Sequence, residues 1–306
     1  EDRWDLTRRY GAAMSSEHGT TDVDFLGLVA DGDPGRFRFT VRNHLSRLDA
    51  RLYGGTAIAV SLTASELVSQ RAPLWMTTQF VSTAPADAEI SVHAEVLAPG
   101  RRTNQVRVTA TDESGAIMFA SLGATGIHRP HGLTGTFEHA PVVTPPEESE
   151  PRGGPFATML RNAGITEMPP LPEGVGFASV VEFREPEVLS HPDPGPSRMC
   201  MWVRRRDGVP LTPATAAFIA DMVPLSVAHG AGLVAGGISL DNTIRIGAFE
   251  PSEWVLVDLR AHFAAGGYGH GAAQLWSESG QLLGTASQTA SMFRFDMSNA
   301  PWSSGS

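Results

Sequence analysis

Strand-like patterns, most of them alternating apolar and polar positions and one (255–261) a β-branched run, occur in four stretches of the first half of the chain and recur in the second half. The tripeptide Glu-Ser-Gly stands at 113–115 and again at 278–280, a shift of 165 positions. Period-two alternation predicts strands, and a short polar turn between two strands predicts a hairpin. The pattern therefore predicts a two-fold internal repeat. The first set of stretches is 75–81, 90–96, 105–111 and 116–122, and the second set is 240–246, 255–261, 270–276 and 281–287.

One helical stretch precedes the strands in each half. Residues 56–69 are rich in alanine and have apolar residues at helical spacing, and residues 213–229 carry Pro213 near their start, where a helix tolerates proline. Pro224 interrupts the second stretch and predicts a kink or a break, because proline has no amide hydrogen. One helix followed by four antiparallel strands, with a strand or two before it, predicts an α+β unit whose sheet wraps the helix.

The composition changes between the two repeats. Residues 131–174 hold two Pro-Pro pairs, a Gly-Gly pair and the acidic run 147–150, which favour turns and a solvated linker. A short helix at 155–163 fits inside this stretch. We therefore expect an N-terminal domain at residues 1–130, a linker at 131–174 and a C-terminal domain at 175–306.

Composition and charge exclude several function classes. The net charge is −10, and all 23 basic residues are arginine, so the chain suits neither nucleic-acid binding nor a lysine Schiff base. The single cysteine, Cys200, cannot form an internal disulfide or a zinc cluster with other cysteines. The sequence has no run of about 18 apolar residues, so no membrane span is predicted. The N-terminal residues have no apolar signal segment, so we expect a cytoplasmic protein.

The repeat also shows where the two halves differ in chemistry. Three polar side chains of the second half stand where the first half has glycine or leucine, which predicts one working site, in the second half. Asp221 stands opposite Gly55, Ser239 opposite Leu74, and Gln288 opposite Gly123.

Asp221 is the candidate base of this site. Its neighbours in the chain are apolar, so burial should raise the pKa of its carboxyl group, and donors from Ser239 and Gln288 should lower it again. A carboxylate tuned in this way can accept a proton from water at neutral pH. The alternative interpretation is that Asp221 caps the chain near Pro224, since aspartate is a common capping residue.

Short motifs in both halves resemble the type II acyl-CoA thioesterases, a TesB-like family with a tandem hotdog fold. The first-half match is Leu52-Tyr53-Gly54-Gly55, and the second-half matches are Asp221, the sequence Ser239-Leu240-Asp241, and Gln288 ahead of a small-apolar-Arg ending. The resemblance covers residues 24–127 and 177–295. It implies an α+β double hotdog in which two antiparallel sheets each wrap a central helix.

The resemblance also implies an activity and its site. Asp221, Ser239 and Gln288 are expected to hold the water that attacks an acyl-CoA or acyl-carrier thioester. Backbone N–H groups near the helix start would bind the oxyanion. No metal and no organic cofactor are implied, and a homo-oligomer is expected. The residues expected to line the substrate are Tyr53, Gly54, Gly55 and Phe218.

The chain departs from the family in places that affect substrate range. Residues 242–246 read Asn-Thr-Ile-Arg-Ile where the family commonly has a His-aromatic-His-Arg stretch, and residues 75–83 lack the usual His, Phe and Arg-Pro-Gly. A non-catalytic acyl-binding protein is therefore one alternative. A hotdog hydratase is another, but its motif Asp-x-Asn-Pro-Leu-His reads Asp-Met-Val-Pro-Leu-Ser at 221–226, without the second proton-transfer group.

Three other motifs are interpreted as structural. The glycine-rich 266–271 lacks the strand–loop–helix context of a nucleotide loop and predicts a strand connection. His128 and His131 flank Pro130 and predict a loop at the domain end, not a metal site. Residues 204–206, three arginines before Asp-Gly, predict a solvated hairpin end.

Overall fold

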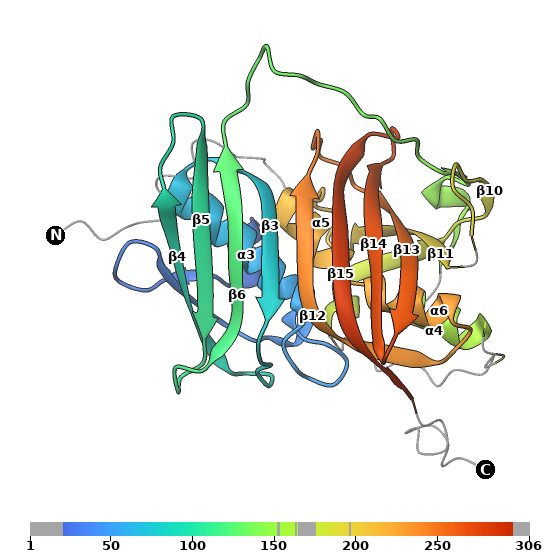
Figure 1. Cartoon of the computed structure of the whole chain (residues 1–306), viewed down its shortest axis with the longest axis horizontal. Helices are drawn as coiled ribbons and strands as arrows, with labels where there is room; N and C mark the ends of the chain where they lie inside the picture. The colour runs from blue at the N-terminus through green and yellow to red at the C-terminus, as the bar shows by residue number, and fades with distance from the viewer. Residues whose placement is uncertain (1–20, 152–153, 163, 165–175, 196, 296–306) are drawn as a thin grey trace.

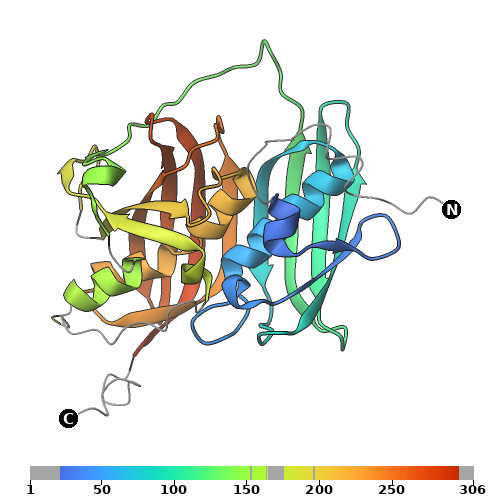
Figure 2. The ribbon, with the colours of Figure 1, turned by 180° about the vertical axis from the view of Figure 1, so that it is seen from behind.

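The computed structural model describes residues 21–151, 154–162, 164, 176–195 and 197–295, which form one large sheet backed by helices (Figures 1 and 2). In the described part of the chain this sheet has thirteen strands, and each pair of neighbours is antiparallel. From edge to edge the order is β1 (Val29–Ala30), β2 (Arg36–Thr40), β4 (Glu89–Ala98), β5 (Thr103–Thr111), β6 (Ile117–Gly126), β3 (Ala72–Phe80), β12 (Ala235–Ile246), β15 (Leu282–Arg294), β14 (Tyr268–Ser277), β13 (Val255–Ala265), β11 (Arg198–Arg205), β9 (Val181–Glu185) and β8 (Glu150–Pro151).

The eight predicted strand stretches are confirmed, with differences of one residue at the end of β3 and at the start of β6 and β15. Their alternation sorts side chains to the two faces, as in β5, where every second residue from Asn104 to Ala110 is buried. The predicted hairpins are β5–β6 and β14–β15, closed by Gly115 and Gly280 in the left-handed conformation that glycine tolerates. The internal repeat is therefore structural as well as sequential.

The two halves meet at the middle of the sheet. β3 of the first half pairs with β12 of the second, with Thr77 opposite Thr243, and the two threonine hydroxyls are 2.9 Å apart. The strand order reads outward from this seam as β3-β6-β5-β4-β2 on one side and β12-β15-β14-β13-β11 on the other. The halves are thus related by a pseudo-two-fold axis at the seam, and the sheet runs through it without an edge.

Each half-sheet covers its own helix. Helix α3 (Gly54–Ser69) packs against β3, β4, β5 and β6, and it is buried on almost every face, with no strong amphipathic side. Helices α5 (Pro213–Ala220) and α6 (Val223–Gly230) take the equivalent place in the second half. α3 also packs against α5, so one hydrophobic core cluster contains residues of both halves.

The predicted interruption of the second helix is confirmed, and it lies just before the proline. α5 begins with a capping box of Thr212 and Thr215, ends at Ala220 and has Asp221 as its C-cap, and α6 begins at Val223. Pro224 cannot donate a backbone hydrogen bond, so the helix cannot run through Asp221 and Met222. Asp221 therefore lies in the break, directly after the last turn of α5 and two residues before the start of α6.

Part of the stretch expected to be linker has regular structure. It contains β7 (Val142–Val143), the 3-10 turn η2 (Pro146–Glu148), β8 and α4 (Gly154–Asn162), where the short helix was predicted. β8 pairs with β9 at the sheet edge, β7 pairs with β10 (Val188–Ser190), and α4 packs against α6. Residues 165–174, like residues 1–20, lie outside the described part of the chain.

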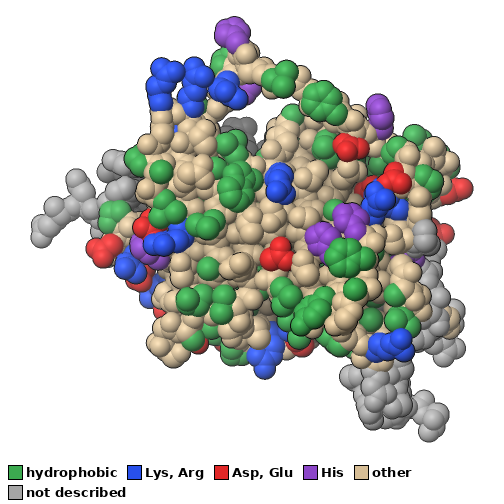
Figure 3. Space-filling view, viewed as in Figure 1, with side chains coloured by type: hydrophobic (Ala, Val, Ile, Leu, Met, Phe, Trp, Pro, Cys, Tyr) green, Lys and Arg blue, Asp and Glu red, His purple; other side chains and the backbone are tan. Residues whose placement is uncertain are grey.

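The helix-free face of the sheet is seen in Figure 3, which has the view of Figure 1. Hydrophobic side chains are scattered over this face, with few charged groups between them. The exposed apolar residues of the strands include Leu122, Ile238, Leu240, Tyr268 and Phe293, each more than 40 % exposed. Over β11, β13 and β14 the same face is covered by chain from 139–144, where Ala140 and Val143 pack on a tryptophan cluster. The remaining elements are α2 (Asp22–Leu26) and the 3-10 turns η1 (Asn43–Leu45) and η3 (Phe177–Ser179).

Candidate active site

The structure brings Asp221, Ser239 and Gln288 together from three different elements. The Gln288 side-chain Nε2 donates to Asp221 Oδ1 at 2.6 Å and to Ser239 Oγ at 2.6 Å. One NH₂ group thus uses both of its hydrogens, one for the carboxylate and one for the hydroxyl. Asp221 comes from the α5–α6 break, Ser239 from β12 and Gln288 from β15.

Strand register places the two donors. β12 has a bulge between Ser239 and Asp241, so Ser239 lies opposite Ala290 while Asn242 lies opposite Gln288. A bulge changes which face the following side chains take, and here it lets Ser239 and Asn242 both lie near Asp221. The Asp221 backbone is held separately, since the Tyr53 hydroxyl donates to its carbonyl oxygen at 3.2 Å.

The N-terminus of α3, from the other half of the chain, completes the site. The Gly55 backbone N–H donates to the Asp221 side chain. A Cβ on Gly54 would collide with Asp221 Oδ2, and one on Gly55 would collide with the Phe218 carbonyl, so both positions need glycine. The positive end of the α3 dipole favours negative charge at this point. The helix start that meets the carboxylate is therefore that of the first repeat.

Burial dominates the electrostatics of Asp221. The residue is 8 % exposed, and burial raises its carboxyl pKa to about 7. The donors Asn242, Gln288 and Gly55, and the more distant charge of Arg47, act in the opposite direction and lower that pKa. A carboxyl group with such a pKa exchanges protons near neutrality, which suits a general base.

Tyr53 and Phe218, expected to line the substrate, lie in a buried aromatic cluster beside Asp221. The Tyr53 ring stacks on Phe177 with centroids 4.2 Å apart and meets Phe218 edge-on at 5.1 Å. Burial and, to a lesser degree, the Asp221 charge raise the pKa of the Tyr53 phenol well above its usual value, so it stays a donor. Both residues are less than 5 % exposed, so in this conformation they act as walls behind the carboxylate.

Asn242 is a member of the site that the sequence comparison did not identify. It is fully buried, and its Nδ2 donates to Asp221 Oδ1 at 3.1 Å. At the repeat offset Asn242 stands opposite Thr77, another polar residue, so the comparison of the halves showed no difference there. The signal that could have found it is its distance along β12, three residues after Ser239, once a bulge is allowed.

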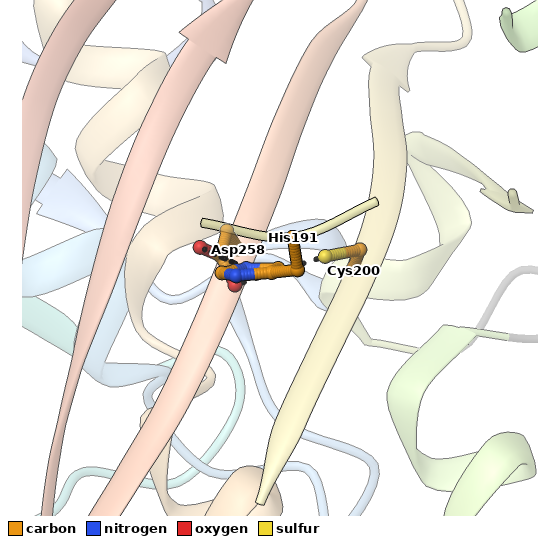
Figure 4. Close-up of side chains that lie close together, drawn as sticks. All are labelled: His191, Cys200 and Asp258. Atoms are coloured by element: carbon orange, nitrogen blue, oxygen red, sulfur yellow. Dashed lines mark hydrogen bonds and ion pairs between the residues drawn. The ribbon is translucent and has the colours of Figure 1, made fainter. Parts of the chain in front are cut away.

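Among the described residues, His191, Cys200 and Asp258 are the one group whose ligand atoms lie close enough to hold a metal ion (Figure 4). Its lone pairs are already used. His191 Nδ1 accepts the Asp193 N–H at 3.0 Å, so the ring hydrogen is on Nε2, which donates to Asp258 Oδ2 at 3.1 Å. Arg198 donates to the same oxygen at 3.0 Å. A metal needs a nitrogen lone pair and would also meet the Arg198 charge, so this group is a hydrogen-bonded clasp.

Burial raises the pKa of the Cys200 thiol, and the Asp258 charge raises it further, so this cysteine is no nucleophile at neutral pH. Two surface hollows lie near this clasp, and neither is lined by Asp221, Ser239 or Gln288. Their lining includes Arg198, which is already paired with Asp193 and Asp258.

The motifs interpreted as structural have the following places. Residues 266–271 form the β13–β14 turn and the start of β14, as predicted. His128 and His131 are exposed in the loop after β6. The prediction of a solvated hairpin end at 204–206 is wrong for Arg205, which is 2 % exposed and pairs with Asp207. Among the helices that the structure describes, none combines the length and the apolarity needed to cross a membrane.

Two matched domains decide the family of the chain. The acyl-CoA thioesterase N-terminal domain matches residues 44–126, and the acyl-CoA thioesterase C-terminal domain matches residues 146–292. The chain belongs to the type II acyl-CoA thioesterase (TesB-like) family. No curated protein matches it by sequence.

Solved structures of similar shape span the whole fold. A candidate thioesterase from Novosphingobium aromaticivorans is 29 % identical, with a TM-score of 0.72 over 86 % of this chain and 97 % of that chain. A hotdog-fold protein from Alicyclobacillus acidocaldarius is 20 % identical, with a TM-score of 0.73 over 90 % and 99 %. An acyl-CoA thioesterase II from Mycobacterium marinum is 19 % identical, with a TM-score of 0.67 over 90 % and 99 %. The predicted α+β double hotdog fold is confirmed.

Proposed function

We propose that this protein hydrolyses acyl-CoA thioesters at the site built on Asp221. The observation that carries the proposal is the Gln288 amide, which bonds the Asp221 carboxylate and the Ser239 hydroxyl at 2.6 Å each. A base and two orienting groups are thus fixed relative to one another before substrate binds. Such preorganisation is a main source of catalysis in hydrolytic sites.

The proposed reaction has two steps. Water, oriented by Ser239 and Gln288, attacks the thioester carbonyl carbon while Asp221 accepts its proton. The tetrahedral oxyanion faces the N–H groups at the N-terminus of α3, where the helix dipole favours negative charge. The intermediate then collapses with cleavage of the C–S bond, and CoA leaves as a thiolate that takes up a proton. Because a thiolate leaves readily, the site needs no strong general acid.

The substrate is placed by the same elements. The thioester carbonyl is expected beside Asp221 at the start of α3, where Gly54 and Gly55 allow the carboxylate and α5 to approach the helix closely. The acyl chain takes the apolar side of the site, toward Tyr53 and Phe218. The carrier is CoA or an acyl carrier protein, and the two give the same chemistry at the carbonyl.

The hydratase alternative meets a structural objection. Ser226 stands where the hydratase motif has its histidine, and its hydroxyl is fully buried and donates to the Val223 carbonyl at 2.7 Å. This hydroxyl serves the backbone of α6 and faces no site. A second proton-transfer group is therefore absent from that motif position, which favours hydrolysis.

A thiol-release assay over a panel of acyl-CoAs of different chain length tests the proposal. We expect release with at least one member, loss of activity in Asp221→Asn, and a fall in kcat of about ten- to a thousandfold in Gln288→Ala, as for loss of one positioning donor. Asp241→Asn is the matched control. The Asp241 side chain accepts a hydrogen bond from the Thr289 N–H and does not bond to Asp221, Ser239 or Gln288. Release by Asp221→Asn at the wild-type rate would contradict the site. No release with any member would favour the acyl-binding alternative.

The expected assembly and location of the protein remain predictions. The exposed apolar side chains on the helix-free face, such as Ile238 and Phe293, would suit pairing of two copies. The predicted location is the cytoplasm, where an enzyme of this kind would meet acyl-CoA substrates. Sedimentation of the purified protein measures its oligomeric state and so tests the predicted homo-oligomer.

A further inference from the structure

Two carboxamides act on one oxygen of Asp221. Gln288 Nε2 donates to Oδ1 at 2.6 Å, and Asn242 Nδ2 donates to the same Oδ1 at 3.1 Å. The other carboxylate oxygen, Oδ2, lies toward Gly54 at the start of α3. The two amides therefore act on one carboxylate oxygen, while the other packs against the start of α3.

The orientation of both amides depends on the charge of Asp221. A carboxylate only accepts hydrogen bonds, so both amides must turn their NH₂ groups toward it. In that orientation the Asn242 Oδ1 and Gln288 Oε1 atoms are buried and have no hydrogen-bond partner in the described part of the chain. A rotated amide would place its oxygen against Oδ1 and repel it. The observed arrangement thus gives Oδ1 two donors, which stabilise the negative charge of the ionised carboxylate more than the neutral acid.

Asn242 is held in place by the sheet. It lies opposite Gln288 on one side and opposite Thr78 of the first repeat on the other, in the strand that forms the seam. Its side chain is fully buried, as is that of Thr78. Thr78 bonds to Ser121 at 2.9 Å and makes no bond to Asp221. In the described part of the chain, the side-chain amide of Asn242 thus bonds to the Asp221 carboxylate.

We propose that Asn242 is a positioning residue that, together with Gln288, holds Oδ1 of Asp221 and favours its carboxylate form at the start of α3. The inference rests on the proposed hydrolase function. The charged and titratable groups that act on Asp221 are Arg47 and Tyr53, from the chain before α3, while the groups that face it from β12 and β15 are neutral. Burial raises the pKa of the Asp221 carboxyl group, and without Asn242 the donors that lower it again would be mainly Gln288 and Gly55.

The pH dependence of kcat/KM tests the inference, with a matched pair of variants. Asn242→Leu removes the donor and keeps the branching and number of side-chain heavy atoms, and Thr78→Val removes a buried hydroxyl from the neighbouring strand. We expect the acid limb of the profile to move up by about one pH unit in Asn242→Leu, which is about tenfold in activity on that limb, with KM within about twofold. Thr78→Val should keep the wild-type profile. An unmoved limb in Asn242→Leu, or an equal shift in Thr78→Val, would overturn the inference.

Two further measurements guard against a variant that does not fold. Asn242→Val places a β-branched residue that suits a strand and has no donor, and it should show the same shift. In the wild-type protein, the NMR signals of the Asn242 side-chain NH₂ should move with pH at the midpoint of the kinetic limb, and constant signals would overturn the inference. If no acyl-CoA is hydrolysed, the proposed function fails, and the NMR titration alone decides whether Asn242 senses Asp221.

Discussion

At the scale of single residues, the candidate site is built at a cost to stability. The Asp221 carboxyl has a pKa of about 7 in the folded protein, against 3.8 for an ordinary aspartate, because burial outweighs its three hydrogen-bond donors. The folded state therefore binds more protons than the unfolded state between these values. By linkage, the free energy of unfolding falls as pH rises from about 4 to about 7, and the full cost is present above pH 7.

Asp221→Asn should therefore stabilise the protein at pH 8 while abolishing activity. The new amide keeps an oxygen for Asn242 and Gln288 and carries no charge. Three pKa units correspond to about 4 kcal/mol as an upper limit, and we expect a gain of about 1–4 kcal/mol. Urea denaturation at pH 8 and at pH 5 measures it, and the gain should shrink at pH 5. An equal gain at both values would assign the effect to packing instead of charge.

At the scale of elements, the connection between β10 and β11 is fastened to β13 by Asp258. Its side chain is fully buried and accepts from His191 and Arg198, and it lies opposite Cys200 in the ladder. Removal of one member of such a group leaves the others buried without their partner, which costs several kcal/mol in other proteins. The clasp therefore holds the chain that covers this part of the sheet.

Asp258→Ala should lower the free energy of unfolding by about 3 kcal/mol, because Arg198 and His191 lose their shared acceptor. Asp193→Ala is the matched control. Asp193 also pairs with Arg198, but its side chain is 51 % exposed, and we expect a loss below about 1 kcal/mol. Chemical denaturation of both variants checks this. Similar small losses in the two would show that the clasp adds nothing beyond a surface pair.

At the scale of the whole molecule, the two repeats should unfold as one unit. The ladder runs through the β3–β12 seam, α3 packs on α5, and one core cluster holds residues of both repeats. We expect one transition in urea. In a Trp75→Phe variant, which removes the tryptophan of β3, fluorescence from Trp202, Trp254 and Trp276 of the second repeat should change together with loss of hydrogen-exchange protection in α3. Two separated midpoints would show that the halves are independent.

The architecture was predicted well because the repeat is written in local patterns. Alternation, with the β-branched run at 255–261, predicted eight strands, and Pro224 predicted the break in the second helix. Position 205 was predicted wrongly for a tertiary reason. A run of arginines usually faces solvent, whereas here the Arg205 guanidinium lies over the Phe25 ring at 4.6 Å and pairs with Asp207.

The sequence by itself determined the repeat, the helix break and the asymmetry that singled out Asp221, Ser239 and Gln288. These depend on residue type and on spacing within one repeat. Only the tertiary structure decided that the N-terminus of α3 meets Asp221 across the seam, and that Asn242 shares the carboxylate with Gln288. The reason is that a β-bulge and the cross-strand register set which side chains meet, and neither is written in the local hydrophobic pattern.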